Sequence, residues 1–295
     1  MSAVAAPNAI PAARRKDRVR GGLFRALLLS CVLVSAAMLV TLLLDVGIDG
    51  AQALSVDFLT NSPSFNPDIA GIWPALLGTL WLMAICTLFI VPIGVATAVY
   101  LEEYADETKW WNRLIEVNIQ NLAAVPSIVY GILGLAFIVR GPLSLGPVVL
   151  AGALTLGLLV LPVVIIAGRE AIRAVPPSIR EGSLALGATQ WQTISKQVLP
   201  AAVPGIATGV ILALSRAIGE TAPLIVIGAA SFVAFAPDGP TSIFTAVPVQ
   251  MFEWISRPQE EFHQLAAAGI LVLMAVLLLM NGVAIWLRNK YESKW

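Results

Sequence analysis

Charged residues are scarce in this chain of 295 residues. Asp, Glu, Lys and Arg make up 12% of it, whereas 58% of its residues are hydrophobic. Several apolar runs reach about twenty residues, the length that crosses a bilayer as a helix, so the composition excludes an ordinary soluble domain. These runs lack the short alternating segments of an outer-membrane barrel. The net charge is zero, which gives no electrostatic reason to expect a nucleic-acid partner.

Cysteine and histidine are also nearly absent. The two cysteines, Cys31 and Cys86, fall inside apolar runs without CxxC spacing, so we interpret them as packing residues. The single histidine, His263, follows Glu260 and Glu261 in a segment that we expect to be a solvated loop. A metal site needs more ligands than these, and the sequence therefore predicts no metal.

The N-terminal part of the chain is a basic tail followed by an apolar run. Residues 1–22 are rich in Ala, Pro and Arg and are expected to be a disordered cytoplasmic tail. Residues 23–46 are predicted to be the first transmembrane helix; a cleaved secretory signal is the alternative, but this run is too long for a signal core. Residues 47–71 contain three Asp and no Lys or Arg, which predicts a periplasmic loop.

Five further apolar runs complete a predicted all-α, polytopic membrane protein with six transmembrane helices. We expect these spans at residues 72–101, 119–139, 147–167, 204–230 and 265–287. The excess length of the second span predicts tilt or a kink at Pro92. The intervening segments are predicted to be an interfacial stretch at 102–118, a cytoplasmic loop at 168–203, an external loop at 231–263 and a basic tail at 288–295.

The distribution of Lys and Arg predicts the orientation of these spans. Fifteen of the 18 basic residues fall in segments assigned to the cytoplasm or, for Arg25, at the start of the first span. Two, Arg140 and Arg257, lie in external segments, and Arg216 lies within a span. Because Lys and Arg concentrate in cytoplasmic loops, we expect both termini on the cytoplasmic side.

The first half of the 168–203 loop is predicted to hold a short helix. Pro176 and Pro177 end any helix that continues from the fourth span, and Ser178 is a favourable N-cap for a new helix. Gly187 is the residue type expected just past the end of a helix. We therefore expect one short helix between these two signals.

A second short helix is predicted to follow. Thr189 and Gln192 have the spacing of a capping box, and the helix should stop before Pro200. The apolar residues of this helix, Trp191, Ile194 and Val198, are expected to share one face. This face could lie on the lipid surface or insert into a partner protein, and both interpretations remain open from the residues alone.

The loop resembles the EAA signature of permease subunits in binding-protein-dependent ABC importers. Glu181, Gly187 and Leu199-Pro200 fall at the spacing of that family, although Gly182-Ser183 replaces its two alanines and Gln197 stands where Ile is usual. In that family the loop seats in a groove of a cytoplasmic ATPase. The resemblance therefore implies that the following residues couple this chain to an ATPase: Glu181, Gly187, Trp191, Ile194, Leu199 and Pro200.

The sequence itself supports a separate ATPase, because it contains no G-x4-G-K-[ST] phosphate loop. We expect this chain to be no enzyme and to bind no cofactor, with ATP used by the partner.

The fifth predicted span carries two charges. Arg216 lies roughly 18 Å into the span at helical rise, near the bilayer midplane, and Glu220 follows on the same face. A charge at that depth costs about 2.5–3.5 kcal/mol on insertion scales and so needs a partner or a cavity. The simpler interpretation is an ion pair that neutralises itself.

The neighbouring residues favour a pathway for an anion instead. Gly219 and Pro223 weaken the helix next to the charges, and Ser215 and Thr221 add hydroxyl groups. An Arg binds phosphate-like oxygens bidentately, and broken helices at mid-membrane are typical of transport sites. We hypothesise that Glu220 releases or reorients Arg216 as the helices move.

The segment 212–224, LALSRAIGETAPL, together with the loop 185–194, ALGATQWQTI, is similar to the PstA family of permease subunits in phosphate ABC importers. This resemblance implies a homologous permease partner (PstC-type), two ATPase subunits (PstB-type) and an external phosphate-binding protein (PstS-type). It also implies location in the bacterial cytoplasmic membrane, in contact with lipid.

Other functions remain open from the residues alone. An Arg at mid-membrane does not discriminate phosphate from molybdate or sulfate. A channel or transporter driven by an ion gradient, with Glu220 as a proton site, is an alternative of a different class.

Overall fold

The computed structural model describes residues 15–106, 108–229 and 232–291. Within these residues the chain is built from helices, without a β-strand. The predicted tails, 1–22 and 288–295, lie partly outside the described residues, and where they are described they are helical. The part of the N-terminal tail from Arg15 onward, predicted to be disordered, continues the first long helix.

The six longer helices, in chain order, are α1 (Arg15–Ala53), α3 (Trp73–Val99), α4 (Trp110–Ala123), α6 (Val149–Arg173), α9 (Leu199–Ile218) and α12 (Glu260–Tyr291). The shorter helices are α2 (Val56–Thr60), α5 (Ser127–Leu133), α7 (Pro177–Ala185), α8 (Gln190–Thr193), α10 (Ala222–Val226) and α11 (Val247–Ile255). The remaining turns are the 3-10 turn η1 (Pro67–Ile69) and the π turns η2 (Tyr100–Tyr104), η3 (Gly134–Val139) and η4 (Ile194–Val198).

The helices account for the predicted membrane spans. Within the described residues, five helices are long and apolar enough to cross a membrane. A sixth span results if α4 and the segment after it, which are bent by 110° relative to each other, count as one. The chain is therefore a multi-pass helical membrane protein, as the composition predicts.

Two units make up the chain, one up to Ile48 and one from Asp49 onward. The first unit consists mainly of α1, which is apolar around its whole circumference, with exposed Leu, Val and Met side chains between Leu23 and Leu44. A helix that is apolar on all sides is suited to lipid or to a neighbouring membrane helix.

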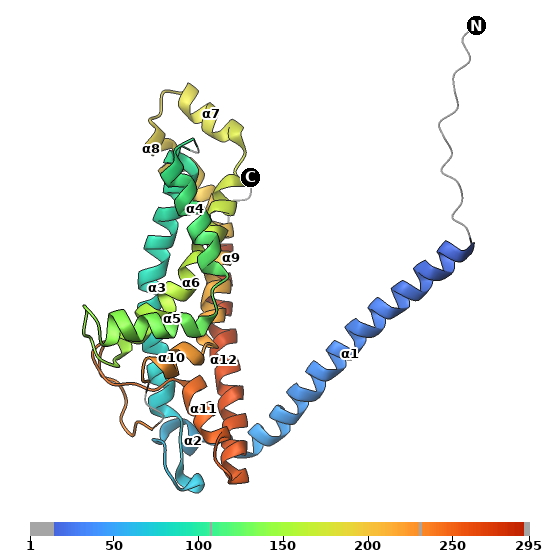
Figure 1. Ribbon diagram of the computed structural model, residues 1–295, viewed down its shortest axis with the longest axis vertical. Coiled ribbons are helices and arrows are strands. Elements are labelled where there is room, and N and C mark those ends of the chain that lie inside the picture. Colours follow the sequence, from blue (N-terminus) through green and yellow to red (C-terminus); the bar gives the residue numbers. More distant parts are fainter. Residues whose placement is uncertain (1–14, 107, 230–231, 292–295) are drawn as a thin grey trace. The chain divides into compact units, whose positions relative to one another are not determined.

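The core of the second unit is a bundle of α3, α6, α9 and α12, which run side by side (Figure 1). The helices α7 and α8 lie at one end of this bundle, and α2 and α11 lie at the other (Figure 1). Buried residues between α3 and α6 include Leu82, Ile90, Leu156 and Val160. This apolar contact fixes the frame on which the polar residues are placed.

Small residues, Gly205 and Gly209 among them, bring α6 and α9 together. A methyl group at position 205 would lie 2.6 Å from the Cβ of Ala171, and one at position 209 would overlap Ala167. Residues 167, 171, 205 and 209 therefore form a matched small-xxx-small contact on both helices.

The predicted third span, 119–139, is wrong as a single helix. The chain forms α4 down to Ala123 and then turns before α5, because Pro126 adopts an extended backbone (φ −57°, ψ 138°). Proline also disfavours helical geometry in the residue that precedes it. As a result α5 crosses the direction of the bundle (Figure 1).

The predicted fifth span, 204–230, is also wrong at both ends. Its helix is continuous from Gln190 through η4 into α9, so the second loop helix does not stop before Pro200. The wider π turn η4 directly precedes this proline, with Leu199 N–H donating to Ile194 O five residues back. Such a turn relieves the contact of the proline ring with the preceding turn. At its other end the helix stops at Ile218, and α10 is a separate short helix.

The segment 231–263, predicted to be an external loop, contains α11 and folds onto the bundle. The amide of Val149 donates to Ser242 O (3.0 Å), and the amide of Val247 donates to Thr79 Oγ1 (2.9 Å). The last helix begins at Glu260, so His263 lies in its first turn rather than in a loop, with Nε2 2.8 Å from Arg257 O.

Replacing Gly209 with Leu is expected to destabilise the protein by about 1–3 kcal/mol, because the side chain would overlap Ala167 and force α6 and α9 apart. Thermal unfolding of the detergent-solubilised protein measures this change. Gly282→Ala on α12 is the matched control, because no atom lies within 4 Å of its position. Equal melting temperatures for the two variants would contradict the close contact.

Candidate functional site

An ion pair lies at the break between α9 and α10. Arg216 Nε lies 3.2 Å from Glu220 Oε1, one helical turn further on. The helix ends at Ile218, and residues 219–221 separate it from α10. This is the break that Gly219 and Pro223 predict, since Pro223 has no N–H to continue the helical hydrogen bonds.

Ser215 ties the break to the last helix. Its hydroxyl donates to Asn281 Oδ1 on α12 (3.0 Å). One heptad away on both helices, Arg288 Nη1 donates to Thr208 Oγ1 (3.2 Å). These two hydrogen bonds hold the rotation of α9 about its axis, and therefore the direction in which Arg216 points.

The two charges of the pair differ in exposure. In this chain alone 43% of the Arg216 side chain is exposed, against 18% of the Glu220 side chain. Glu220 accepts a hydrogen bond from Nε of the guanidinium, and the two Nη groups make no hydrogen bond to Glu220. An exposed guanidinium in a membrane span faces a cavity or another chain, since facing lipid is costly.

Helix α10 packs on α5 immediately after the break. Pro223 is buried, and a methyl group on Gly131 would lie 2.8 Å from its Cα. Tyr130 is buried beside this contact, and its hydroxyl donates to Leu122 O in α4 (2.8 Å). The two short helices therefore share a close contact next to Arg216. Thr221 precedes α10 as a partly buried residue.

The second candidate region is the turn between α7 and α8. Gly187 has φ +85°, the left-handed conformation expected of a glycine after a helix. Thr189 Oγ1 accepts from the amide of Gln192 (3.3 Å), and Gln192 Oε1 accepts from the amide of Thr189 (2.9 Å), which confirms the capping box. The predicted N-cap Ser178 is wrong, because the N-cap is Pro176, two residues earlier, and α7 begins at Pro177.

One departure from the family signature has a local explanation. The hydroxyl groups of Ser183 on α7 and Thr193 on α8 lie 2.9 Å apart and form a hydrogen bond. An alanine at position 183 could not make this bond. The two helices are thus joined by side chains as well as by the backbone turn.

The apolar face predicted for the second loop helix is divided in the structure. Trp191 is 61% exposed, whereas Ile194 and Val198 are buried against Ile172 and Ala202. Ile194 therefore cannot contact a partner directly while this packing is intact. Leu186, 91% exposed, and Leu184 provide the exposed apolar surface of the turn instead.

Glu181, Leu199 and Pro200 differ in their surroundings. Glu181 is exposed on α7, and Pro200 is exposed in the first turn of α9. Leu199 is partly buried against the core that holds Ile194. The structure therefore places Glu181, Gly187 and Trp191 on the exposed α7–α8 turn at one end of the bundle (Figure 1). Ile194 and Leu199 lie in the apolar core that supports this turn.

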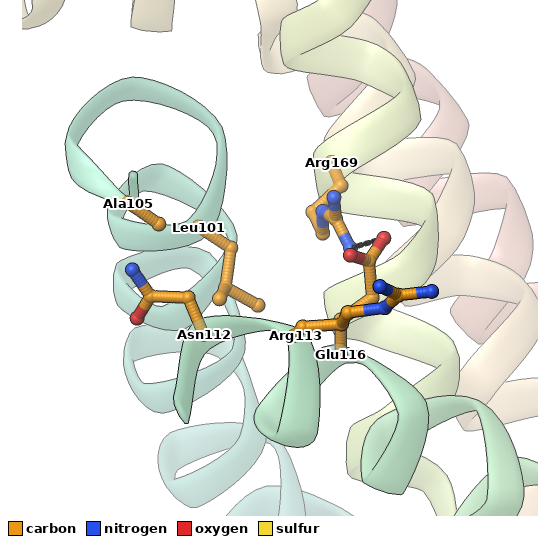
Figure 2. Close-up of a pocket in the computed structure, with 6 residues that line it drawn as sticks. All are labelled: Leu101, Ala105, Asn112, Arg113, Glu116 and Arg169. Carbon is orange, nitrogen blue, oxygen red and sulfur yellow. Dashed lines mark hydrogen bonds and ion pairs between the residues drawn. The ribbon is translucent and has the colours of Figure 1, made fainter. Parts of the chain in front are cut away.

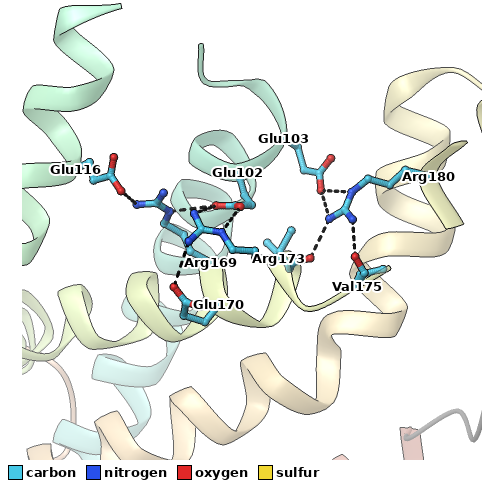
Figure 3. A network of polar contacts seen from close by, with 9 residues as sticks. Glu102, Glu103, Glu116, Arg169, Glu170, Arg173, Val175 and Arg180 are labelled. Carbon is cyan, nitrogen blue, oxygen red and sulfur yellow. Dashed lines mark hydrogen bonds and ion pairs between the residues drawn. The ribbon is translucent and has the colours of Figure 1, made fainter. Parts of the chain in front are cut away.

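A cluster of ion pairs underlies this turn (Figure 3). Glu102 in η2, the turn that continues α3, accepts from Arg169 (3.3 Å) and Arg173 (2.8 Å) of α6. Arg169 also donates to Glu116 of α4 (2.9 Å). Three helices are joined by these contacts, and the exposure of the Arg169 side chain is low enough for the pairs to be screened little by water.

A polar pocket of about 380 Å³ opens beside this cluster (Figure 2). Its lining residues are Leu101, Ala105, Asn112, Arg113, Glu116 and Arg169. Because the Glu116 carboxylate already faces the Arg169 guanidinium, the pocket offers a mixed polar lining rather than a cationic one.

The turn that leads into α4 is held by an acidic side chain. Asp106 Oδ1 accepts from the Thr108 hydroxyl (2.6 Å) and from the Thr108 amide (3.0 Å). These hydrogen bonds, the first foremost, lower the pKa of the Asp106 carboxyl below its usual value. The carboxylate therefore stays ionised, and Asn112 completes the turn by donating to Asp106 O (3.0 Å).

Sequence reasoning missed several polar residues at both regions. It gave no role to Asn281 or to the ion-pair residues Glu102, Glu103, Arg169, Arg173 and Arg180. The signals were present as an Asn inside an apolar run and as charges at the ends of two spans. Their pairing depends on contacts between helices far apart in the chain.

Known proteins resemble this chain over most of its length. The "Probable ABC transporter permease protein YqgI" of Bacillus subtilis is 32% identical, over 94% of this chain and 97% of that protein. The "Phosphate transport system permease protein PstA 1" of Mycobacterium tuberculosis is 34% identical, over 74% of this chain and 70% of that protein.

A solved structure shares the fold. A chain of a bacterial alginate ABC transporter, solved with an alginate pentasaccharide-bound periplasmic protein, superposes with a TM-score of 0.67 at 18% identity and covers 91% of this chain and 94% of that one. Residues 90–293 match the model of the family "Binding-protein-dependent transport system inner membrane component". With the broken helix around Arg216 and the exposed α7–α8 turn on the same scaffold, the chain belongs to this family of ABC transporter membrane components.

Proposed function

We propose that this chain is the PstA-type permease subunit of an ATP-driven phosphate importer. The observation that carries the proposal is Arg216, whose guanidinium is exposed inside a membrane span at a helix break. A phosphate anion offers oxygens that match the free fork of an Arg. The similarity to phosphate transport permeases supports this substrate over other oxyanions.

The exposure of Arg216 supports a pathway shared with a second chain. The outward stripe of α9 also contains the exposed residues Thr208 and Leu212. A lipid environment would leave the guanidinium unsolvated, so a homologous permease of the PstC type would cover this face. The two permeases would then each supply one side of the translocation pathway.

Energy would enter at the α7–α8 turn. The exposed Leu184, Leu186 and Trp191 form an apolar tip with Glu181 close by in the chain. Such a tip suits insertion into a groove of a separate ATPase, two copies of the PstB type serving the two permeases. The chain would itself bind no ATP and carry out no covalent chemistry.

Lipid bilayer and an external binding protein complete the assembly. The α7–α8 end would lie in the bacterial cytoplasm together with both chain termini, and the opposite end, with α2 and α11, would face a phosphate-binding protein of the PstS type. Movement of the ATPases would rock the bundle between states open to either side, with Glu220 releasing Arg216 when phosphate enters.

Reconstitution tests the proposed class. The four components in proteoliposomes are expected to take up labelled phosphate when ATP is enclosed with the ATPase, and not when only a proton gradient is applied. Uptake with a proton gradient and no ATPase would contradict an ATP-driven importer. Uptake of molybdate or sulfate in preference to phosphate would replace the substrate assignment.

Arg216→Ala is expected to lower phosphate uptake by roughly 10- to 100-fold, the range that corresponds to losing hydrogen bonds to a charged group. Arg216→Lys keeps the charge without the bidentate fork and should give an intermediate rate. Uptake is measured in the same proteoliposomes, with assembly checked by co-purification. Arg140→Gln, an exposed Arg outside the break, is the control, and undiminished uptake by Arg216→Ala would exclude this residue from the pathway.

Glu181→Lys is expected to weaken association with the ATPase by at least about tenfold, because it reverses a charge at the docking surface. Binding of the purified ATPase to permease in nanodiscs measures the change. Glu260→Lys reverses an exposed charge at the first turn of α12, at the other end of the bundle, and serves as the control. Equal ATPase affinity of both variants would place the docking surface elsewhere.

A further inference from the structure

Helix α7 is held in place by polar contacts rather than by a core of its own. None of its residues is fully buried, and only Ile179 packs partly against the neighbouring apolar core. Its backbone is attached at one side through the extended Pro176 and at the other through the left-handed Gly187.

Arg180 supplies the missing attachment. Its Nε and Nη2 atoms lie 3.0 Å and 2.8 Å from Glu103 Oε1, at the end of α3. Its Nη1 donates to Val175 O (2.7 Å) and its Nη2 to Ile172 O (2.8 Å), two carbonyls at and just beyond the end of α6. One side chain thus fastens α7 to both α3 and α6 (Figure 3).

Glu103 also holds the far side of the turn. The side-chain amide of Gln190, the first residue of α8, donates to the Glu103 main-chain oxygen (2.8 Å). Ser183 and Thr193 bridge α7 and α8 between these two attachments. The α7–α8 turn is therefore anchored from both sides on one residue of η2, which continues α3.

The Arg180–Glu103 contact is well shielded from water. The two side chains are 23% and 10% exposed, respectively. An ion pair with little exposure and further hydrogen bonds to carbonyls is directional and is disrupted at a high cost when one partner is neutralised. The ion pair is therefore expected to stay intact when α7 moves, so that a displacement of α7 also displaces Glu103.

We propose that the Arg180–Glu103 ion pair is a coupling strut, which makes α3 move together with α7 when the ATPase shifts the turn. This inference rests on the proposed function. It gives the turn a route to α3, in addition to its chain connections to α6 and to the continuous α8–α9 helix. Arg180 and Glu103 act as positioning residues, since neither touches the transported anion.

The first test compares phosphate uptake per ATP hydrolysed by the complete importer in proteoliposomes. Glu103→Gln keeps the main-chain contact to Gln190 and loses the ion pair. It is expected to leave ATPase association and hydrolysis intact and to lower uptake per ATP by about fivefold or more, the lower end of typical coupling energies. Arg180→Lys, which keeps one charge contact, should fall between this variant and the parent protein.

Glu170→Gln is the matched control, because Glu170 is an exposed carboxylate at the same end with only a 3.6 Å contact to Arg173. Its uptake per ATP should equal that of the parent. An unchanged ratio in Glu103→Gln would overturn the proposal. Loss of the assembled complex in that variant would also overturn it, because the contact would then serve folding rather than transmission.

A distance measurement makes the inference testable without any transported substrate. Spin labels at Tyr104→Cys and Ser178→Cys report the separation of the α3 end from α7, after Cys31→Ser removes the exposed native thiol. With ATP added, this distance should stay constant in the parent and shift or broaden in Glu103→Gln. An equal shift in both proteins would exclude the strut, whereas failure of phosphate uptake alone would refute only the proposed function.

Discussion

Pairing of charges at the end of α3 is the interaction on which the arrangement of the helices at that end depends. Glu102 receives two guanidinium groups from α6, and Glu103 receives one from α7. Charges so close to an apolar bundle must be matched, because an unpaired buried charge costs several kcal/mol. The matching leaves one arrangement of α3, α6 and α7, and α4 joins it through Glu116.

Between that end and Arg216 the helices pack closely through small residues. Gly205 and Gly209 bring α9 against α6, and Gly94 and Gly168 bring α3 against a neighbouring face of α6. Helices packed at this distance move as a unit, because any sliding would break many contacts at once. A displacement of the α7–α8 turn would therefore move the break between α9 and α10 by a similar amount.

Much of the architecture follows from local sequence signals, with exceptions at Pro200, Pro126 and Ile194. Gly187, the capping box at Thr189 and the break at Gly219 are where their residue types place them. Pro200 does not end its helix, because a π turn accommodates it, and the bend at Pro126 divides a run that composition alone presents as one span. Ile194, expected on an outer face, is buried because the helix rotates it toward Ile172.

The sequence by itself determined the membrane environment, the number of apolar runs, the turn chemistry and the position of Arg216 in a weakened helix. These depend on composition and on residues within about one helical turn of each other. Only the tertiary structure decided that Arg180 meets Glu103, that Ser215 meets Asn281 and that α5 lies against α10. Those contacts join residues far apart in the chain, and they are selected by the packing of whole helices, which no local pattern specifies.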